Sequence, residues 1–197
     1  MDFSPLNEAL VSKSYDKIAE ILDELMLQAA TDGVPYQDEW PYSIHLLGHI
    51  IANDINSARF LWKSIPGGVK ESRPEVAAVW RIGQQLWLRD YAAVHEAVRG
   101  FDWSAELRDL VVAFSELYTK RIFLLLLSAY STISIGDTAR FLGMTEEDAT
   151  NYTQRQGWIV DPASGMLTVT KQPVVKEQKL DSSKLQRLTE YVFHLEH

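Results

Sequence analysis

Two histidines four residues apart are the side chains in this sequence with the clearest potential for chemistry. His45 and His49 lie in an apolar stretch that favours a helix, and this spacing places both imidazoles on one helix face, where they could bind one metal ion. None of the three residues between them is the glutamate of a zinc-protease helix, and no third ligand is evident nearby. His194 and His197 are equally incomplete as a ligand set. We therefore expect histidines that pack or face solvent, with no metal and no other cofactor.

Nucleophilic and phosphoryl-transfer chemistry has no matching residue pattern either. The chain contains no cysteine, so it has neither a thiolate nucleophile nor a thiolate metal site. It contains no Gly-x-Ser-x-Gly elbow and no phosphate-binding glycine loop. The acidic residues are spread along predicted helix faces, where solvation is their ordinary role. We predict that the chain is not an enzyme and takes no small-molecule substrate.

Composition and charge favour protein partners. The 197 residues are 46% hydrophobic and 23% charged, typical of a globular chain that buries roughly 70% of its unfolded surface. The net charge of −8 disfavours nucleic acid, because each phosphate contact needs a cation. The most apolar run, Ile122 to Leu127, is far shorter than the roughly 20 residues that span a bilayer. The start of the chain has no secretory signal, and the absence of cysteine suits a reducing compartment, so we expect the cytoplasm and nucleus.

Residues 1–104 have the apolar periodicity of stacked helices. Apolar residues recur at helical spacing over about 15–33, 41–52, 56–65, 74–88 and 91–98. Pro66-Gly67-Gly68 is expected to stop the third of these helices, and Pro74 suits the first position of the fourth. We expect Trp80 and Trp87, seven residues apart, to fill the groove between stacked helices.

Three of the helix junctions resemble one another. Residues 13–16, 53–56 and 89–92 each join two apolar helices through a short polar corner that carries one large apolar residue. These residues are Tyr15, Ile55 and Tyr91, which recur about every 36 to 40 positions. This period is typical of helix–turn–helix solenoids, whose repeats bury their apolar faces by stacking. The pattern predicts a TPR-like or HEAT-like arm.

Residues 105–172 have the element order of a winged helix. A long helix is predicted from about Ala105 to Tyr130, and capping boxes that begin at Ser134 and Thr145 open two short helices. Residues 158–160 and 166–170 then form a predicted β-hairpin around a proline- and glycine-containing turn. Three helices followed by a hairpin predict a winged-helix module, and the whole chain is therefore mainly α.

A winged helix often binds DNA, but the second short helix here disfavours that function. It opens with Glu146, Glu147 and Asp148 and carries one arginine, Arg155. Three carboxylates facing a polyanion would repel it, whereas recognition helices offer cations and amides to the DNA. We therefore expect no nucleic-acid binding.

The end of the chain is predicted to be an assembly helix. A polar linker over 173–180 precedes a helix over 181–197, in which apolar residues alternate at steps of three and four. This seam consists of Leu185, Leu188, Val192 and Leu195. It must be buried either against helices of other subunits, which we favour because of the linker, or against the repeats of its own chain.

Helical repeats that lead into a winged helix resemble the PCI domain, which the proteasome lid, the COP-nine signalosome and translation initiation factor three share. Residues 53–66, 80–87, 89–90, 156–158, 188–192 and 195–196 are similar to the subunit-eight family of the signalosome, with the plant form the most similar. The resemblance implies a non-catalytic scaffold subunit of the complex that removes Nedd-eight from cullins and regulates cullin–RING ubiquitin ligases. In plants it implies a link to repression of light-dependent development.

The resemblance also implies how such a subunit assembles. PCI subunits join through winged-helix edges and a bundle of C-terminal helices, without nucleic acid or membrane. On this sequence the first contact maps to Trp158, Ile159, Val160, Leu167 and Val169, and the second to the C-terminal seam. The alternatives are a small PCI subunit of initiation factor three or of the proteasome lid, and, more distantly, a DNA-binding regulator.

Overall fold

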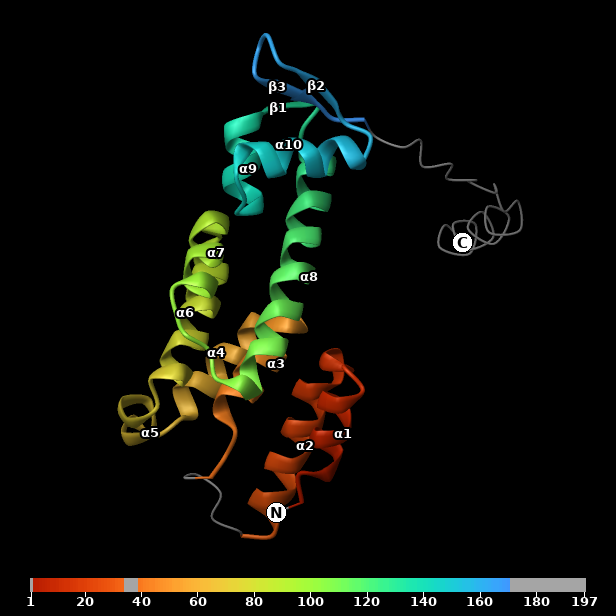
Figure 1. Cartoon of the computed structure of the whole chain (residues 1–197). Helices are drawn as coiled ribbons and strands as arrows, with labels where there is room; N and C mark the ends of the chain where they lie inside the picture. The colour runs from red at the N-terminus through yellow and green to blue at the C-terminus, as the bar shows by residue number, and fades with distance from the viewer. Residues whose placement is uncertain (1, 34–38, 171–197) are drawn as a thin grey trace, which may run out of the picture.

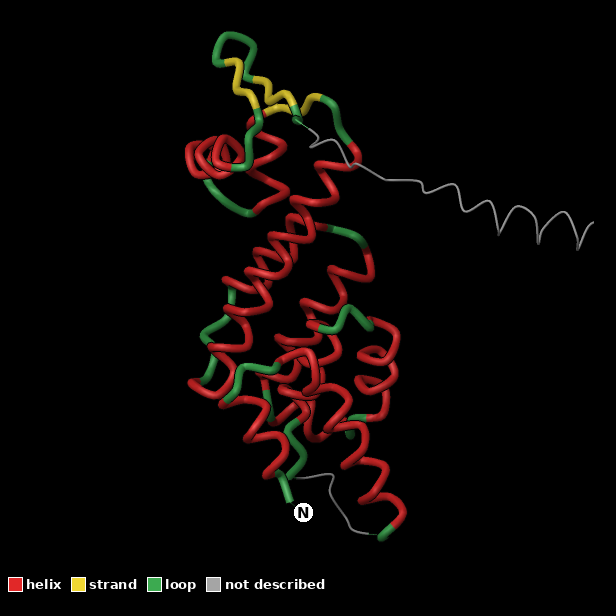
Figure 2. Tube along the Cα trace, turned by 90° about the vertical axis from the view of Figure 1, so that its right-hand side faces the viewer, coloured by secondary structure: helices red, strands yellow, loops and turns green. Residues whose placement is uncertain are grey.

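The computed structural model describes residues 2–33 and 39–170, so the linker and C-terminal helix predicted over 173–197 lie outside the described residues. The molecule is elongated, with a helical arm at one end and a small sheet at the other, and one long helix runs between them (Figures 1 and 2). The predicted mainly α fold class is confirmed.

The elements follow one another in the predicted order. The arm contains α1 (Ser4–Val11), a 3₁₀ turn (Tyr15–Lys17), α2 (Ile18–Thr31), α3 (Tyr42–Ile51), α4 (Ile55–Ser64), α5 (Gly67–Ser72), α6 (Pro74–Leu88) and α7 (Tyr91–Arg99). The long helix is α8 (Ala105–Ala129). The winged helix follows with β1 (Thr132–Ser134), α9 (Ile135–Leu142), α10 (Glu146–Arg155), β2 (Ile159–Asp161) and β3 (Met166–Thr168).

The three similar junctions share one backbone geometry. Lys13, Asn53 and Arg89 are the non-glycine residues with positive φ in the described part of the chain, at 56°, 63° and 58°. After each of them, the next backbone N–H donates to the carbonyl five residues back, at 2.9 to 3.0 Å. This is the Schellman end of a helix, which satisfies carbonyls that the last turn leaves unpaired. The sequence similarity of the junctions therefore reflects one turn used three times.

The same corners also begin the next helix. The side chains of Asp54 and Asp90 accept a hydrogen bond from the backbone N–H three residues on, at 3.0 Å and 3.1 Å. The apolar residue that follows, Ile55 or Tyr91, is partly buried against the core. Ser14 makes no such side-chain cap, and a 3₁₀ turn replaces the first turn of the helix at that corner. Each corner thus ends one helix, turns the chain and fixes the start of the next.

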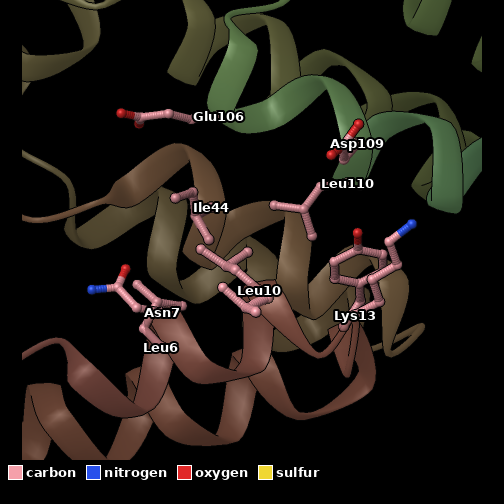
Figure 3. Close-up of a pocket in the computed structure, with 10 residues that line it drawn as sticks. Leu6, Asn7, Leu10, Lys13, Ile44, Glu106, Asp109 and Leu110 are labelled. Atoms are coloured by element: carbon pink, nitrogen blue, oxygen red, sulfur yellow. The ribbon is translucent and has the colours of Figure 1, made fainter.

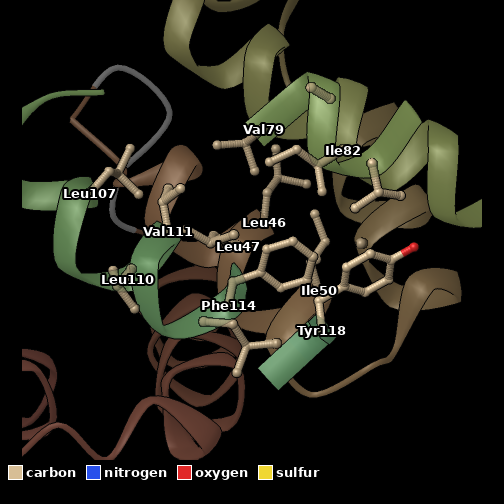
Figure 4. Packing of buried hydrophobic residues seen from close by; sticks show 14 of the residues in the cluster. Leu46, Leu47, Ile50, Val79, Ile82, Leu107, Leu110, Val111, Phe114 and Tyr118 are labelled. Carbon is tan, nitrogen blue, oxygen red and sulfur yellow. The ribbon is translucent and has the colours of Figure 1, made fainter. Parts of the chain in front are cut away.

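The core of the arm is built around α3, where nine of ten residues are buried. Leu46, Leu47 and Ile50 pack between α6 and α8, and Figure 4 shows Phe114 and Ile82 reaching them from these two helices. Burying each such side chain contributes roughly 1.5 to 3 kcal/mol.

Two short elements were not predicted. Pro66-Gly67-Gly68 was expected to stop α4, and α4 does end there, but Gly67 begins the short helix α5 with Pro66 as its N-cap residue. Val69 is buried, which gives this otherwise polar turn a contact with the core. β1 has only three residues, too few to produce a recognisable alternation, and it forms because β3 pairs with it.

The two tryptophans of α6 differ from one another. Trp80 is buried and its ring stacks on that of Trp62 at 5.5 Å, as expected for a groove between helices. The expectation was wrong for Trp87, which is 50% exposed. Trp87 lies in the last turn of α6 and faces Arg59 of α4 instead of an apolar side chain, with the guanidinium 4.7 Å from the ring centroid.

These two residues form a matched pair for a stability measurement. Trp80→Ala is expected to lower the free energy of unfolding by about 3 to 5 kcal/mol, because it leaves a cavity beside Trp62. Trp87→Ala is expected to change it by less than about 1 kcal/mol, because half of the ring is already in water. Urea denaturation of both variants tests this, and equal losses would contradict the difference in burial.

Candidate functional site

The winged helix forms a distinct surface at the end of the molecule opposite α1 and α2 (Figure 1). Its sheet is antiparallel with the order β1-β3-β2, so β3 is central, and Leu167 lies opposite Ile133 on one side and Val160 on the other. The predicted hairpin is confirmed, and β1 adds a third strand to it. Both β1 and β2 are edge strands.

The predicted caps hold the two short helices. Ser134 Oγ accepts a hydrogen bond from the Asp137 N–H at 3.0 Å, and Thr145 Oγ1 accepts one from the Asp148 N–H at 3.1 Å. Each hydroxyl also donates to the carboxylate of the same acid, at 2.7 Å and 2.8 Å. Gly143 ends α9 with a φ of 66°.

A packed joint fixes the winged helix to the arm. The ring of Trp158 stacks on Phe123 of α8 at 5.1 Å, and His95 Nε2 of α7 lies 3.0 Å from the Phe141 carbonyl oxygen, to which it donates. Arg99 Nη1 donates to the Gly143 carbonyl at 2.7 Å. A Cβ on Gly143 would lie 2.2 Å from His95 Cγ, so only glycine fits there. Burial lowers the pKa of His95 and so favours its neutral form at this joint.

The five winged-helix residues predicted to contact a partner lie in two environments. Trp158, Leu167 and Val169 are buried and support the sheet from inside. Val160 is partly buried, and Ile159 is 64% exposed on the edge strand β2. Their role in binding stays a prediction, and the surface available for it consists of Ile159 and the backbone edge of β2. The seam from Leu185 to Leu195 lies outside the described residues.

The second short helix presents an acidic surface. Glu146, Glu147 and Asp148 occupy the first turn of α10 and all three are exposed. Carboxylates in this position interact favourably with the helix dipole. The same three charges would repel a phosphate backbone, and the absence of DNA binding stays a prediction.

The histidine pair is buried in the arm and lies next to an exposed acid that the sequence did not reveal. His45 and His49 are both buried, with their rings stacked at 4.8 Å. Asp23 of α2 reaches them, and ligand atoms of the three side chains lie within 4.8 Å of one another. The expectation that no third ligand lies nearby was therefore wrong. Asp23 is 22 residues before His45 on another helix, so no spacing rule indicates it.

The hydrogen bonds of this cluster oppose metal binding. The indole N–H of Trp40 donates to His45 Nδ1 at 3.1 Å, so Nδ1 is the acceptor and the ring proton is on Nε2. Nε2 donates that proton to Asp23 Oδ1 at 2.9 Å. A histidine that ligates a metal normally donates its other N–H to an acceptor, whereas here a donor faces that nitrogen. The cluster is a hydrogen-bonded link between α2 and α3.

We expect the purified protein to contain no stoichiometric zinc, because the indole N–H of Trp40 faces His45 Nδ1. Elemental analysis after dialysis against a zinc-containing buffer tests the expectation. One equivalent of zinc that is lost in the His45→Ala, His49→Ala double variant would contradict it.

The cluster predicts a pH dependence of stability. Burial, and then the neighbouring His49, lowers the pKa of His45 to about 4, against about 6.5 in an unfolded chain. The unfolded state therefore binds the proton more readily, so this contribution to stability is complete above about pH 6.5 and is lost as the pH falls towards 4. The loss is on the order of 3 kcal/mol. Urea denaturation across this range should show a smaller acid destabilisation in His45→Gln than in the wild type, and identical slopes would contradict the assignment.

A groove lies between α1 and the start of α8 and has a volume of about 520 Å³. Figure 3 shows Leu6 and Leu10 of α1 facing Leu110 of α8, with Glu106 and Asp109 on the rim. None of the described residues that line it is a histidine, serine or threonine. The groove therefore offers no pair of a nucleophile and a histidine base. In the described residues, no helix combines the length and apolarity needed to cross a membrane.

Comparison with known proteins agrees with this architecture. A family model described as the CSN8/PSMD8/EIF3K family matches residues 36–179. The COP9 signalosome complex subunit 8 of Arabidopsis thaliana is 66% identical over 197 residues, which is 100% of both chains. The subunit 8 proteins of Danio rerio and Xenopus laevis are 35% and 34% identical over 91% and 94% of this chain, and over 96% and 94% of their own. The chain therefore belongs to the CSN8/PSMD8/EIF3K family, within its group of COP9 signalosome subunit 8 proteins.

Proposed function

We propose that the chain is a non-catalytic scaffold subunit of the COP9 signalosome, working in the cytoplasm and nucleus. The complex removes Nedd-eight from cullins and so regulates cullin–RING ubiquitin ligases, and in plants this includes repression of light-dependent development. The observation that carries the proposal is the 66% identity to the Arabidopsis subunit over the full length of both chains. Similarity at this level and coverage extends through the arm and the winged helix alike.

The chemistry of the described residues supports a scaffold. The one cluster of potential metal ligands in that part of the chain consists of Asp23, His45 and His49. Trp40 donates a hydrogen bond to His45 Nδ1, which opposes metal binding there. The groove between α1 and α8 is lined by acids but by no histidine, serine or threonine among the described residues. The isolated chain should therefore not cleave a Nedd-eight–cullin conjugate.

The edge of the winged-helix sheet is the first proposed assembly contact. An edge strand has a row of backbone donors and acceptors with no partner on its outer side, and a strand from another subunit can pair with it. β2 is such an edge, and Ile159 adds a large apolar side chain that is mostly exposed. The joint at His95 and Gly143 fixes the direction in which this edge points.

The C-terminal helix is the second proposed contact, and it rests on the sequence pattern. Each of the four seam residues contributes roughly 1.5 to 3 kcal/mol when buried. The entropy lost on association offsets part of this gain, and a micromolar or tighter affinity remains. Such a helix would anchor the subunit without help from the repeats.

Purification of the tagged full-length chain from cells, followed by identification of its companions, tests the proposal. The expected companions are the other signalosome subunits. Subunits of initiation factor three or of the proteasome lid in their place would overturn it and favour the other branches of the family.

Variants separate the two proposed contacts. Deletion of residues 181–197 is expected to eject the chain from the complex and to leave its melting temperature nearly unchanged. Ile159→Lys is expected to weaken incorporation, whereas Leu124→Lys, at an exposed position on α8, serves as the matched control. A large drop in melting temperature on deletion would show that the helix packs on its own repeats.

A further inference from the structure

Charge is unevenly distributed along the arm. Residues 1–54 contain two basic and ten acidic residues, whereas residues 55–90 contain six basic and three acidic ones. The second segment forms α4, α5 and α6, which lie on the side of the arm away from α1 and α2 (Figure 1). An acidic protein thus has a locally basic sector.

This sector also exposes large apolar side chains. Trp87 is 50% exposed, and Phe60 and Leu88 are each 69% exposed. Arg59 and Trp87 meet where α4 contacts α6, with the guanidinium over the ring, and the exposed Phe60 and Leu88 are the next residues along the two helices. We call Arg59, Phe60, Trp87 and Leu88 the α4–α6 face. Large apolar side chains gathered on a charged surface typically mark an interaction site.

An aromatic ring stack next to the face holds α4 and α6 together. The Trp62 ring stacks on the buried Trp80 at 5.5 Å, and the Lys70 ammonium lies 4.7 Å from the centroid of Trp62. The stack sets the spacing of α4 and α6, and so the position of Arg59 against Trp87. A preorganised surface loses little conformational entropy when a partner binds.

The cations near the face have no ion-pair partner among the residues that the structure describes. In the described residues, no acidic side chain lies within ion-pair distance of Arg59, Lys63 or Lys70. A guanidinium stacked on an aromatic ring keeps its N–H donors in a planar fork that suits a carboxylate. Aromatic residues and arginine are also the residue types that most often dominate binding energy at interfaces.

We propose that the α4–α6 face docks an acidic peptide segment of a partner protein that carries one large apolar side chain. The apolar side chain covers Trp87 and Phe60, and flanking carboxylates pair with Arg59 and Lys63. Charge complementarity carries this choice of occupant, because the sector is basic while the rest of the arm is acidic. The net charge of −8 favours a short acidic segment over a nucleic acid, whose long phosphate backbone would meet the surrounding acids.

Fluorescence anisotropy with the full-length chain tests the proposal. The probe is a fluorescein-labelled synthetic peptide with one phenylalanine flanked on both sides by aspartates and glutamates. One control peptide replaces the acids by their amides, and another replaces the phenylalanine by alanine. We expect saturable binding of the probe that weakens as salt is added, and weaker binding of both controls.

Variants locate the binding. Arg59→Glu and Trp87→Ala are each expected to weaken binding by at least about tenfold. Arg155→Glu on α10 and Leu124→Ala on α8 are matched changes at exposed positions elsewhere and should leave it unchanged. Circular dichroism melting of each variant confirms that the fold is retained, and Arg59→Lys serves if Trp87→Ala unfolds, since it keeps the charge and removes the fork.

Several outcomes would overturn the proposal. These are no binding of the probe, equal binding by Arg59→Glu, or equal binding of the amide peptide. Tighter binding of a single-stranded oligonucleotide than of the probe would assign the face to nucleic acid. Concentration-dependent self-association that Arg59→Glu abolishes would assign it to the acidic region of a second copy.

Discussion

The burial of α3 is the constraint on which the rest of the arm depends. Almost every side chain of this helix is inside, so α2, α4, α6 and α8 must all pack against it. Gly48 permits the close approach of α2 to α3, since a Cβ there would lie 2.9 Å from Ile18 Cγ2. Because the polar atoms of a buried helix need partners, His45 depends on Trp40 and Asp23 for its two hydrogen bonds. The close packing of the arm and the hydrogen bonds of its buried polar side chain are thus both determined at α3.

The regular parts of this fold could be predicted from sequence because they follow local rules. Helical periodicity located the long elements, and the capping residues Ser134 and Thr145 marked where α9 and α10 begin. Parts that depend on distant neighbours could not be predicted in this way. Asp23 reaches His45 only through packing of two helices, and β1 exists only through pairing with β3. Trp87 meets Arg59 of α4 where an apolar neighbour was expected. The chemistry of the histidine pair depended on such a distant neighbour.

The winged helix and the arm share one continuous core, which affects how an assembly surface would work. Buried residues from α3 through α8 to Trp158 and Leu167 belong to the same hydrophobic cluster. α8 contributes to the arm at its start and to the winged helix at its end, through Phe123. The edge of β2 is therefore connected to the arm through packed side chains. The boundary proposed at residues 104 and 105 divides the sequence within this shared core.

The three left-handed corners have a consequence for how such arms change over time. Each corner is closed by backbone hydrogen bonds that do not involve the side chains of Lys13, Asn53 or Arg89. A non-glycine residue in this conformation costs roughly 1 to 2 kcal/mol, which neighbouring packing must offset. A substitution that keeps this backbone conformation therefore changes the surface charge and the stability, while the hydrogen bonds that close the turn remain. The curvature of the arm is thus set by hydrogen bonds of the backbone, and the side chains at its three bends take no part in them.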